Sequence, residues 1–99
     1  ILMGIINGVK EVSKMIEYEK TVKIELLNEL SKGVTARLIA YLSKENIPID
    51  TPNNFYVLLY QQFKEMLNLN LFALSYDELE QVEQYWLAMD KLLNNRFLQ

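Results

Sequence analysis

Helix-breaking residues are scarce in this chain of 99 residues. It contains three Gly and two Pro, the two residue types that disfavour a helix interior most strongly. Beyond residue 8 these are Gly33, Pro48 and Pro52. The stretches between them carry apolar residues at the three- and four-residue spacing that places side chains on one helix face. The sequence therefore predicts long helices joined by short loops.

Four segments show this spacing, and we expect helices at about residues 8–32, 35–46, 52–68 and 76–95. Short loops favour antiparallel neighbours, so the predicted fold is all-α, a four-helix antiparallel bundle. We see no linker or repeat and expect a single domain over residues 1–99.

Capping signals mark the predicted helix ends. Gly33 stands where a helix C-cap is expected. Thr51 is a suitable N-cap, with Pro52 at the first helical position. Ser75 and Glu78 have the spacing of a capping box, in which each side chain bonds the other residue's backbone N–H. These signals predict a stop after the first helix and clean starts for the last two.

Each long segment has an apolar face. The first predicted face consists of Ile5, Val9, Val12, Ile16, Leu26, Leu27 and Leu30. The third consists of Phe55, Leu58, Leu59, Phe63, Met66 and Leu69, and the last of Leu79, Val82, Trp86, Met89, Leu93 and Phe97, with Trp86 as the central core residue. Glu19 and Lys23 have the i,i+4 spacing of an ion pair within a helix. Residues 21–26 also alternate like a strand, but we favour helix because no second strand is evident.

The chain contains no His and no Cys. Thiol nucleophiles, disulfides, zinc or haem ligands and an imidazole base are therefore excluded. The carboxylates lie among polar residues on predicted exposed faces, so none has the apolar setting that would suit acid–base catalysis. We expect a protein that is not an enzyme and that has neither a metal nor a cofactor.

The charge is uneven along the sequence. The chain has 10 basic and 13 acidic side chains, a net charge of −3. Residues 67–99 hold five acidic side chains against Lys91 and Arg96, which accounts for the whole excess. Acids near a helix N-terminus suit the helix dipole, and an acidic helix also attracts a basic partner.

No run approaches the roughly 18 apolar residues of a membrane span. The apolar patch at residues 1–8 has no preceding positive charge and is too short for a signal peptide. We therefore expect a cytoplasmic protein.

Aromatic residues beside the apolar faces are candidates for partner binding, because Tyr and Trp are enriched at binding hot spots. The predicted partner-binding residues are Tyr56 and Tyr60 as anchors, Tyr85 on the last helix, and Glu80, Glu83 and Asp90 as an acidic rim. The expected mechanism is occlusion of a partner surface by the last two helices.

The run from Gly33 to Leu42, followed by Ile47-Pro48, resembles the helix-turn-helix of MerR-like regulators. The resemblance implies an alternative function, DNA binding by residues 33–46, with Thr35, Arg37 and Lys44 facing the DNA. Three dispersed cations on an acidic chain are poorly suited to neutralising phosphates, so nucleic acid is not the partner we expect.

A second resemblance covers residues 22–93. The Leu-rich run Ile24–Leu30, the restart at Asp50-Thr51-Pro52 and the sequence Leu74-Ser75-x-x-Glu78 are similar to those of pediocin-like bacteriocin immunity proteins. That family implies a non-enzymatic four-helix protector acting at a membrane sugar-transporter receptor.

The preferred interpretation is a small, non-catalytic protein-binding module, either an immunity protein, an inhibitor or a regulator. Its partner is another protein, such as a membrane receptor complex or a toxin. Besides DNA binding, a further alternative is a homo-oligomeric virion or assembly subunit that buries the wide apolar stripe of residues 55–69.

Overall fold

A computed structural model describes the backbone of residues 2–97 and the side chains of residues 17–96. This part of the chain forms α1 (Leu2–Lys44), α2 (Phe55–Leu67), the short 3-10 helix η1 (Leu71–Ala73) and α3 (Tyr76–Phe97). Residues 2–97 contain no strand. The all-α prediction is confirmed, but the four-helix bundle is wrong because the described backbone, residues 2–97, forms three α-helices.

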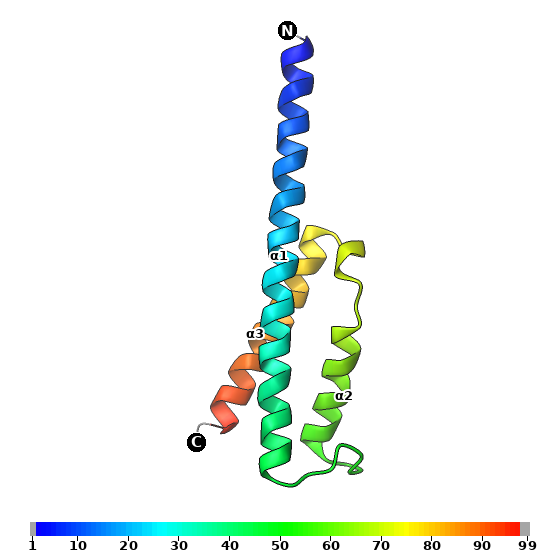
Figure 1. The fold of residues 1–99 in the computed structure, drawn as a ribbon, viewed down its shortest axis with the longest axis vertical. Coiled ribbons are helices and arrows are strands. Elements are labelled where there is room, and N and C mark those ends of the chain that lie inside the picture. The colour runs from blue at the N-terminus through cyan, green and yellow to red at the C-terminus, as the bar shows by residue number, and fades with distance from the viewer. Residues whose placement is uncertain (1, 98–99) are drawn as a thin grey trace.

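α2 and α3 both pack against the C-terminal part of α1. The N-terminal part of α1 extends beyond the other helices, α2 runs back antiparallel to α1, and α3 then crosses α1 in the opposite direction to α2 (Figure 1). The Cα atoms extend over 67 × 25 × 15 Å. The molecule is therefore elongated, and its core lies at one end.

The predicted stop at Gly33 is wrong. α1 continues through it and joins the predicted helices 8–32 and 35–46 into one. Gly33 lacks the positive φ of a glycine C-cap. Val34 and Leu38, which follow it, are fully buried, and burying them outweighs the cost of about 1 kcal/mol for a glycine inside a helix. Residues 21–26 are helical as well, so the strand alternative is also wrong.

α2 begins three residues later than predicted. Thr51 does not cap the helix; its backbone N–H and its hydroxyl both donate to the carbonyl of Pro48, at 3.1 and 2.7 Å. The N-cap is Asn54, whose Oδ1 accepts from the N–H groups of Tyr56 and Val57 at 2.9 and 3.1 Å. The turn chemistry of residues 48–54 therefore takes the place of the predicted first helical turn.

The capping box at the start of α3 is confirmed. The Ser75 N–H donates to Glu78 Oε1 at 3.0 Å, and the Glu78 N–H donates to Ser75 Oγ at 3.2 Å. The backbone hydrogen bond from Ser75 holds the pKa of Glu78 below its usual value. These two bonds satisfy exposed N–H groups at the helix start.

Trp86 is the central core residue, as predicted. It is 1% exposed, and its ring lies 5.0 Å from that of Phe63, tilted by 56°. The buried apolar residues are Ile24, Leu27, Val34, Leu38, Leu42, Val57, Leu59, Phe63, Leu79, Val82, Trp86 and Leu93.

The predicted apolar faces are only partly buried. Leu26 on α1, and Phe55 and Leu58 on α2, are at least half exposed. The buried stripe of α1 is rotated toward Ile24, Leu27 and Val34, since α1 faces two helices at once. The side chains of Ile5, Val9, Val12, Ile16 and Phe97 lie outside the described residues.

Candidate partner-binding surface

The three tyrosines predicted to bind a partner, on α2 and α3, lie partly inside the protein. Tyr56 stacks at a tilt on Tyr41, with ring centroids 4.8 Å apart. Tyr60 is half-buried, and the Lys64 ammonium lies 5.8 Å from its ring centroid. The Tyr85 hydroxyl donates to Gln62 Oε1 at 2.8 Å, and burial raises the Tyr85 pKa. All three tyrosines therefore support the packing of the helices, and each keeps some accessible surface.

The three carboxylates of the predicted acidic rim differ in their surroundings. Glu83 pairs with Lys23 of α1 at 2.9 Å, and Asp90 pairs with Arg37 of α1. Glu80 is exposed. The Lys23–Glu83 pair takes the place of the predicted pairing of Lys23 with Glu19. Two members of the rim thus bind α1 directly, while Tyr85 faces α2.

The residues of the DNA-binding alternative are arranged for packing. Thr35 is buried, and its hydroxyl has no hydrogen-bond partner among the described residues. Arg37 bonds Asn94 as well as Asp90 on α3. Lys44 is exposed at the end of α1. Since residues 33–44 are an uninterrupted helix, the turn that a helix-turn-helix requires is absent from them.

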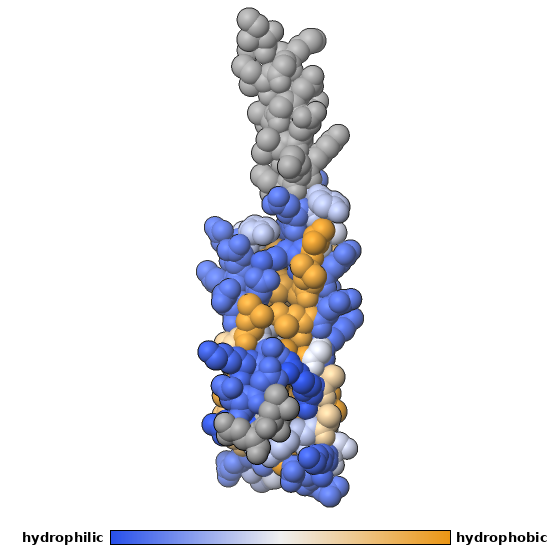
Figure 2. Space-filling model, turned by 90° about the vertical axis from the view of Figure 1, so that its left-hand side faces the viewer, coloured by the Kyte–Doolittle hydropathy of each residue, from blue (hydrophilic) through white to orange (hydrophobic). Residues whose placement is uncertain are grey.

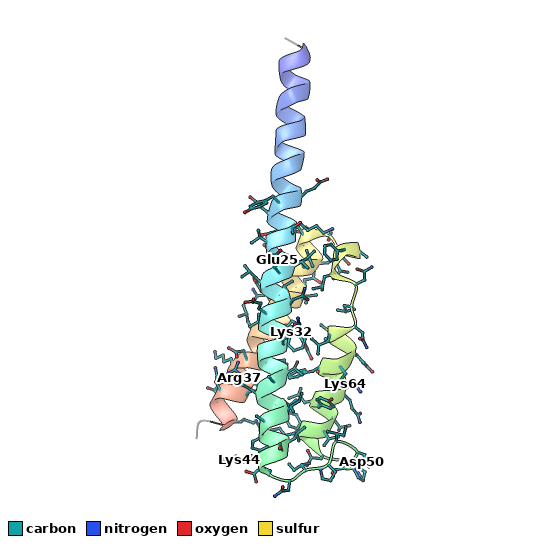
Figure 3. All side chains as sticks on the ribbon, viewed as in Figure 1. Glu25, Lys32, Arg37, Lys44, Asp50 and Lys64 are labelled. Carbon is teal, nitrogen blue, oxygen red and sulfur yellow. The ribbon has the colours of Figure 1, made fainter. Side chains whose placement is uncertain are left out.

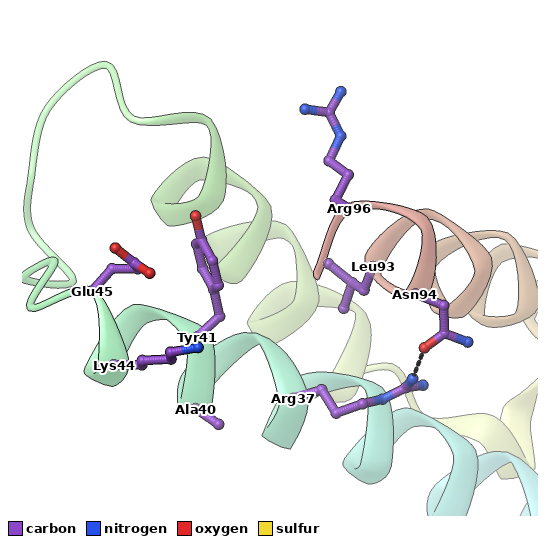
Figure 4. A pocket seen from close by; sticks show the side chains of 8 residues that line it. All are labelled: Arg37, Ala40, Tyr41, Lys44, Glu45, Leu93, Asn94 and Arg96. Carbon is purple, nitrogen blue, oxygen red and sulfur yellow. Dashed lines mark hydrogen bonds between the residues drawn. The ribbon is translucent and has the colours of Figure 1, made fainter. Parts of the chain in front are cut away.

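A hollow lies near the C-terminal ends of α1 and α3 (Figure 4). Its volume is about 370 Å³, and it is lined by Arg37, Ala40, Tyr41, Lys44, Glu45, Leu93, Asn94 and Arg96. The Arg96 guanidinium lies 5.4 Å from the ring centroid of Phe55. Because Arg37 is already paired with Asp90 and Glu45 offsets Lys44, Arg96 is the cation that leaves this lining with a small positive charge.

A second hollow, which sequence reasoning missed, lies between α1 and the start of α3. We call it the α1–α3 groove; its lining is Tyr18, Glu19, Val22, Lys23, Leu26, Tyr76 and Glu83, and its volume is about 290 Å³. Tyr18 is 72% exposed and Leu26 57% exposed. Helical periodicity could have indicated this surface. If Ile24, Leu27, Val34 and Leu38 form the buried face of the helix, the 3.6-residue period places Leu26 on the side that faces solvent.

Among the residues with described side chains, no group of three Asp, Glu, His or Cys gathers to hold a metal ion. Within the same part of the chain, no helix has the length and apolarity that crossing a membrane requires.

The arrangement resembles chains from bacterial toxin–antitoxin systems. One solved chain, from a toxin–antitoxin system bound to its substrate, matches with a TM-score of 0.77 and 33% identity, covering 83% of this chain and 96% of that one. Another, from the PezAT system of Streptococcus pneumoniae, has a TM-score of 0.71 and 26% identity, covering 79% and 83%. The fold is therefore one that solved toxin–antitoxin systems contain.

Sequence comparison defines the family. The profile of the bacterial epsilon antitoxins matches residues 16–95. Antitoxin epsilon of Streptococcus pyogenes is 36% identical over 76 residues, which cover 77% of this chain and 84% of that protein. The chain also matches antitoxin PezA of S. pneumoniae, at 26% identity over 92% of its own length but 58% of PezA. The chain belongs to the epsilon antitoxin family.

Family membership corrects the two resemblances inferred from sequence. The match over residues 16–95 overturns both the bacteriocin immunity family and the MerR-like regulator, and the membrane receptor implied by the former loses its support. The expectation of a protein that is not an enzyme is confirmed, as is the broader expectation of a small, helical inhibitor that binds another protein.

Proposed function

We propose that this chain is an antitoxin that binds a toxin protein and neutralises it by covering part of the toxin surface. The family match over residues 16–95 carries this proposal, because it includes all of α2, all but the last two residues of α3 and most of α1. The similar solved chains from toxin–antitoxin systems support it. We also infer that the protein acts in the cytoplasm, as its sequence suggests.

The contact residues predicted from sequence remain part of this proposal. They are Tyr56, Tyr60, Glu80, Glu83, Tyr85 and Asp90. Of these, Glu80 is the most accessible, since Glu83 and Asp90 are paired with α1. Family membership favours this binding role over the homo-oligomeric assembly subunit.

Co-expression tests the proposed function. A toxin encoded beside this chain's gene is induced in a heterologous bacterium, alone and together with the chain. We expect growth arrest by the toxin and recovery when the chain is present. The control is Trp86→Asp, which places an unpaired charge in the core and should abolish folding and recovery. Persistent arrest while folded wild-type chain accumulates would overturn the proposal.

A further inference from the structure

The α1–α3 groove offers apolar surface to solvent. Tyr18, Val22 and Leu26 lie on successive turns of α1, and Tyr76 faces them from the start of α3. The groove is kept in shape by Lys23, whose ammonium group bonds Glu83 at 2.9 Å and lies 5.5 Å from the Tyr76 ring centroid. An exposed apolar hollow with a fixed polar edge is suited to receiving a side chain from another protein.

Apolar surface continues along the same side of the molecule. Figure 2 shows apolar residues gathered in the middle of one face and framed by hydrophilic ones. On α1, Leu30 follows Leu26 by one turn, and on α3, Leu87 follows Glu83 by one turn. Leu87 is 44% exposed. The groove is thus part of a wider apolar face between two helices.

The charge around this groove is strongly negative. Residues 17–30 and 75–84, which flank it, contain eight carboxylates and two lysines, a net charge of −6. The remaining residues between 31 and 96 contain six cations and four carboxylates, a net charge of +2. Figure 3 shows Glu25 on the part of α1 nearer the groove, and Arg37 and Lys44 toward the C-terminal end of α1. The molecule is therefore polarised along α1.

We propose that the α1–α3 groove receives an apolar side chain of the toxin that is flanked by Lys or Arg residues. The proposal rests on the proposed toxin-binding function. The apolar lining supplies contact area, and the surrounding carboxylates select a basic partner surface and accelerate its approach. Charge complementarity thus identifies the chemistry of the toxin segment, and the exposed Tyr18 and Leu26 identify the site where it binds.

Binding of the full chain to the toxin encoded beside its gene tests this proposal. Tyr18→Gln combined with Leu26→Gln should weaken affinity by about tenfold or more, as expected for central interface residues. The matched control is Ile39→Gln, which changes an exposed apolar residue of α1 outside the groove and should alter affinity by less than about twofold. All three sites are exposed, so thermal unfolding should confirm intact folds.

Two charge-reversal variants test whether the groove selects a basic partner surface. Glu19→Lys should slow association by about threefold or more at low salt, and the difference should shrink at high salt. Glu45→Lys, the same change outside the groove, should alter association by less than about twofold. A photo-crosslinking p-benzoylphenylalanine in place of Leu26 should capture a toxin segment with Lys or Arg close to an apolar residue.

The outcomes separate the two proposals. If the wild-type chain binds the toxin and the groove variants bind equally well, the groove is not the binding site and the proposed function stands. Capture of an acidic toxin segment would overturn the inferred partner chemistry. If the folded wild-type chain does not bind the toxin, the proposed function itself falls.

Discussion

The Lys23 ammonium on α1 lies 2.9 Å from the Glu83 carboxylate on α3 and donates a hydrogen bond to it. The two residues are 60 positions apart in sequence, and their side chains are 14% and 27% exposed. The hydrogen bond to Glu83 raises the pKa of Lys23. The pair fixes the start of α3 against α1 at the edge of the α1–α3 groove.

A double-mutant cycle should detect this pair. We expect Lys23→Met and Glu83→Gln to be coupled by about 1 kcal/mol in the free energy of unfolding, measured with urea at pH 7. Because the folded pKa of Lys23 is raised, this stabilisation is complete below the ordinary value of 10.5 and is lost as pH rises through the higher folded value. The coupling should therefore be equal at pH 7 and pH 9. Absence of coupling at pH 7 would show that the pair does not form.

Gly33→Ala should stabilise the protein. Gly33 lies inside α1 without a positive φ, and an added Cβ would meet no atom within 4 Å beyond its two chain neighbours and the local helix backbone. Alanine should therefore add about 0.5–1 kcal/mol to the free energy of unfolding. Ala36→Gly, at a nearby exposed position, is the control and should subtract a similar amount. Destabilisation by Gly33→Ala would mean that the helix ends there.

The predicted helix end at Gly33 shows which features cannot be predicted from the sequence alone. A glycine after a helical stretch is a valid C-cap signal, and the sequence alone does not reveal that Val34 and Leu38 will be buried by two other helices. The Ser75–Glu78 capping box could be predicted because all its hydrogen bonds are local. The burial of Trp86 was predictable from its position on one stripe. Signals that depend on local hydrogen bonds could therefore be predicted from the sequence, whereas tertiary packing overrode the local C-cap signal at Gly33.

Thr35→Val should also stabilise the protein. The buried Thr35 hydroxyl has no partner among the described residues, and valine has nearly the same shape without the polar atom. We expect a gain of about 1 kcal/mol in the free energy of unfolding. Ser31→Ala is the comparison, since the buried Ser31 hydroxyl donates to the Asn28 carbonyl at 3.1 Å and its removal should bring less. A loss of stability in Thr35→Val would reveal a hydrogen bond made by that hydroxyl.

Ser75→Ala should weaken the start of α3. Loss of an N-cap of this kind costs about 1 kcal/mol, measurable as a lower Tm. The lowered pKa of Glu78 adds a pH dependence: its stabilisation is complete above the ordinary value of 4.5 and is lost as pH falls through the lower folded value. Glu78→Gln should flatten part of the acid unfolding curve. An acid unfolding curve identical to that of the wild type would contradict this contribution.

The candidate site was harder to predict than the fold. Tyr85 was recognised as an amphipathic residue, but its hydrogen bond to Gln62 depends on how α2 and α3 face each other. Leu26 was assigned to the apolar face of the first predicted helix from its helical spacing. The packing of α3 beside Lys23 instead leaves Leu26 exposed next to a groove. A surface formed by two segments that are distant in sequence can be predicted only when the way the segments pack against each other is known.

Calorimetric titration of the folded, full-length chain into its active toxin tests the central claim most directly. We expect saturable binding with a Kd below about 1 μM, or about −8 kcal/mol, together with loss of toxin activity as the complex forms. A folded chain that gives no saturable binding, or that leaves the toxin fully active when bound, would contradict the assignment of this protein as a toxin-neutralising antitoxin.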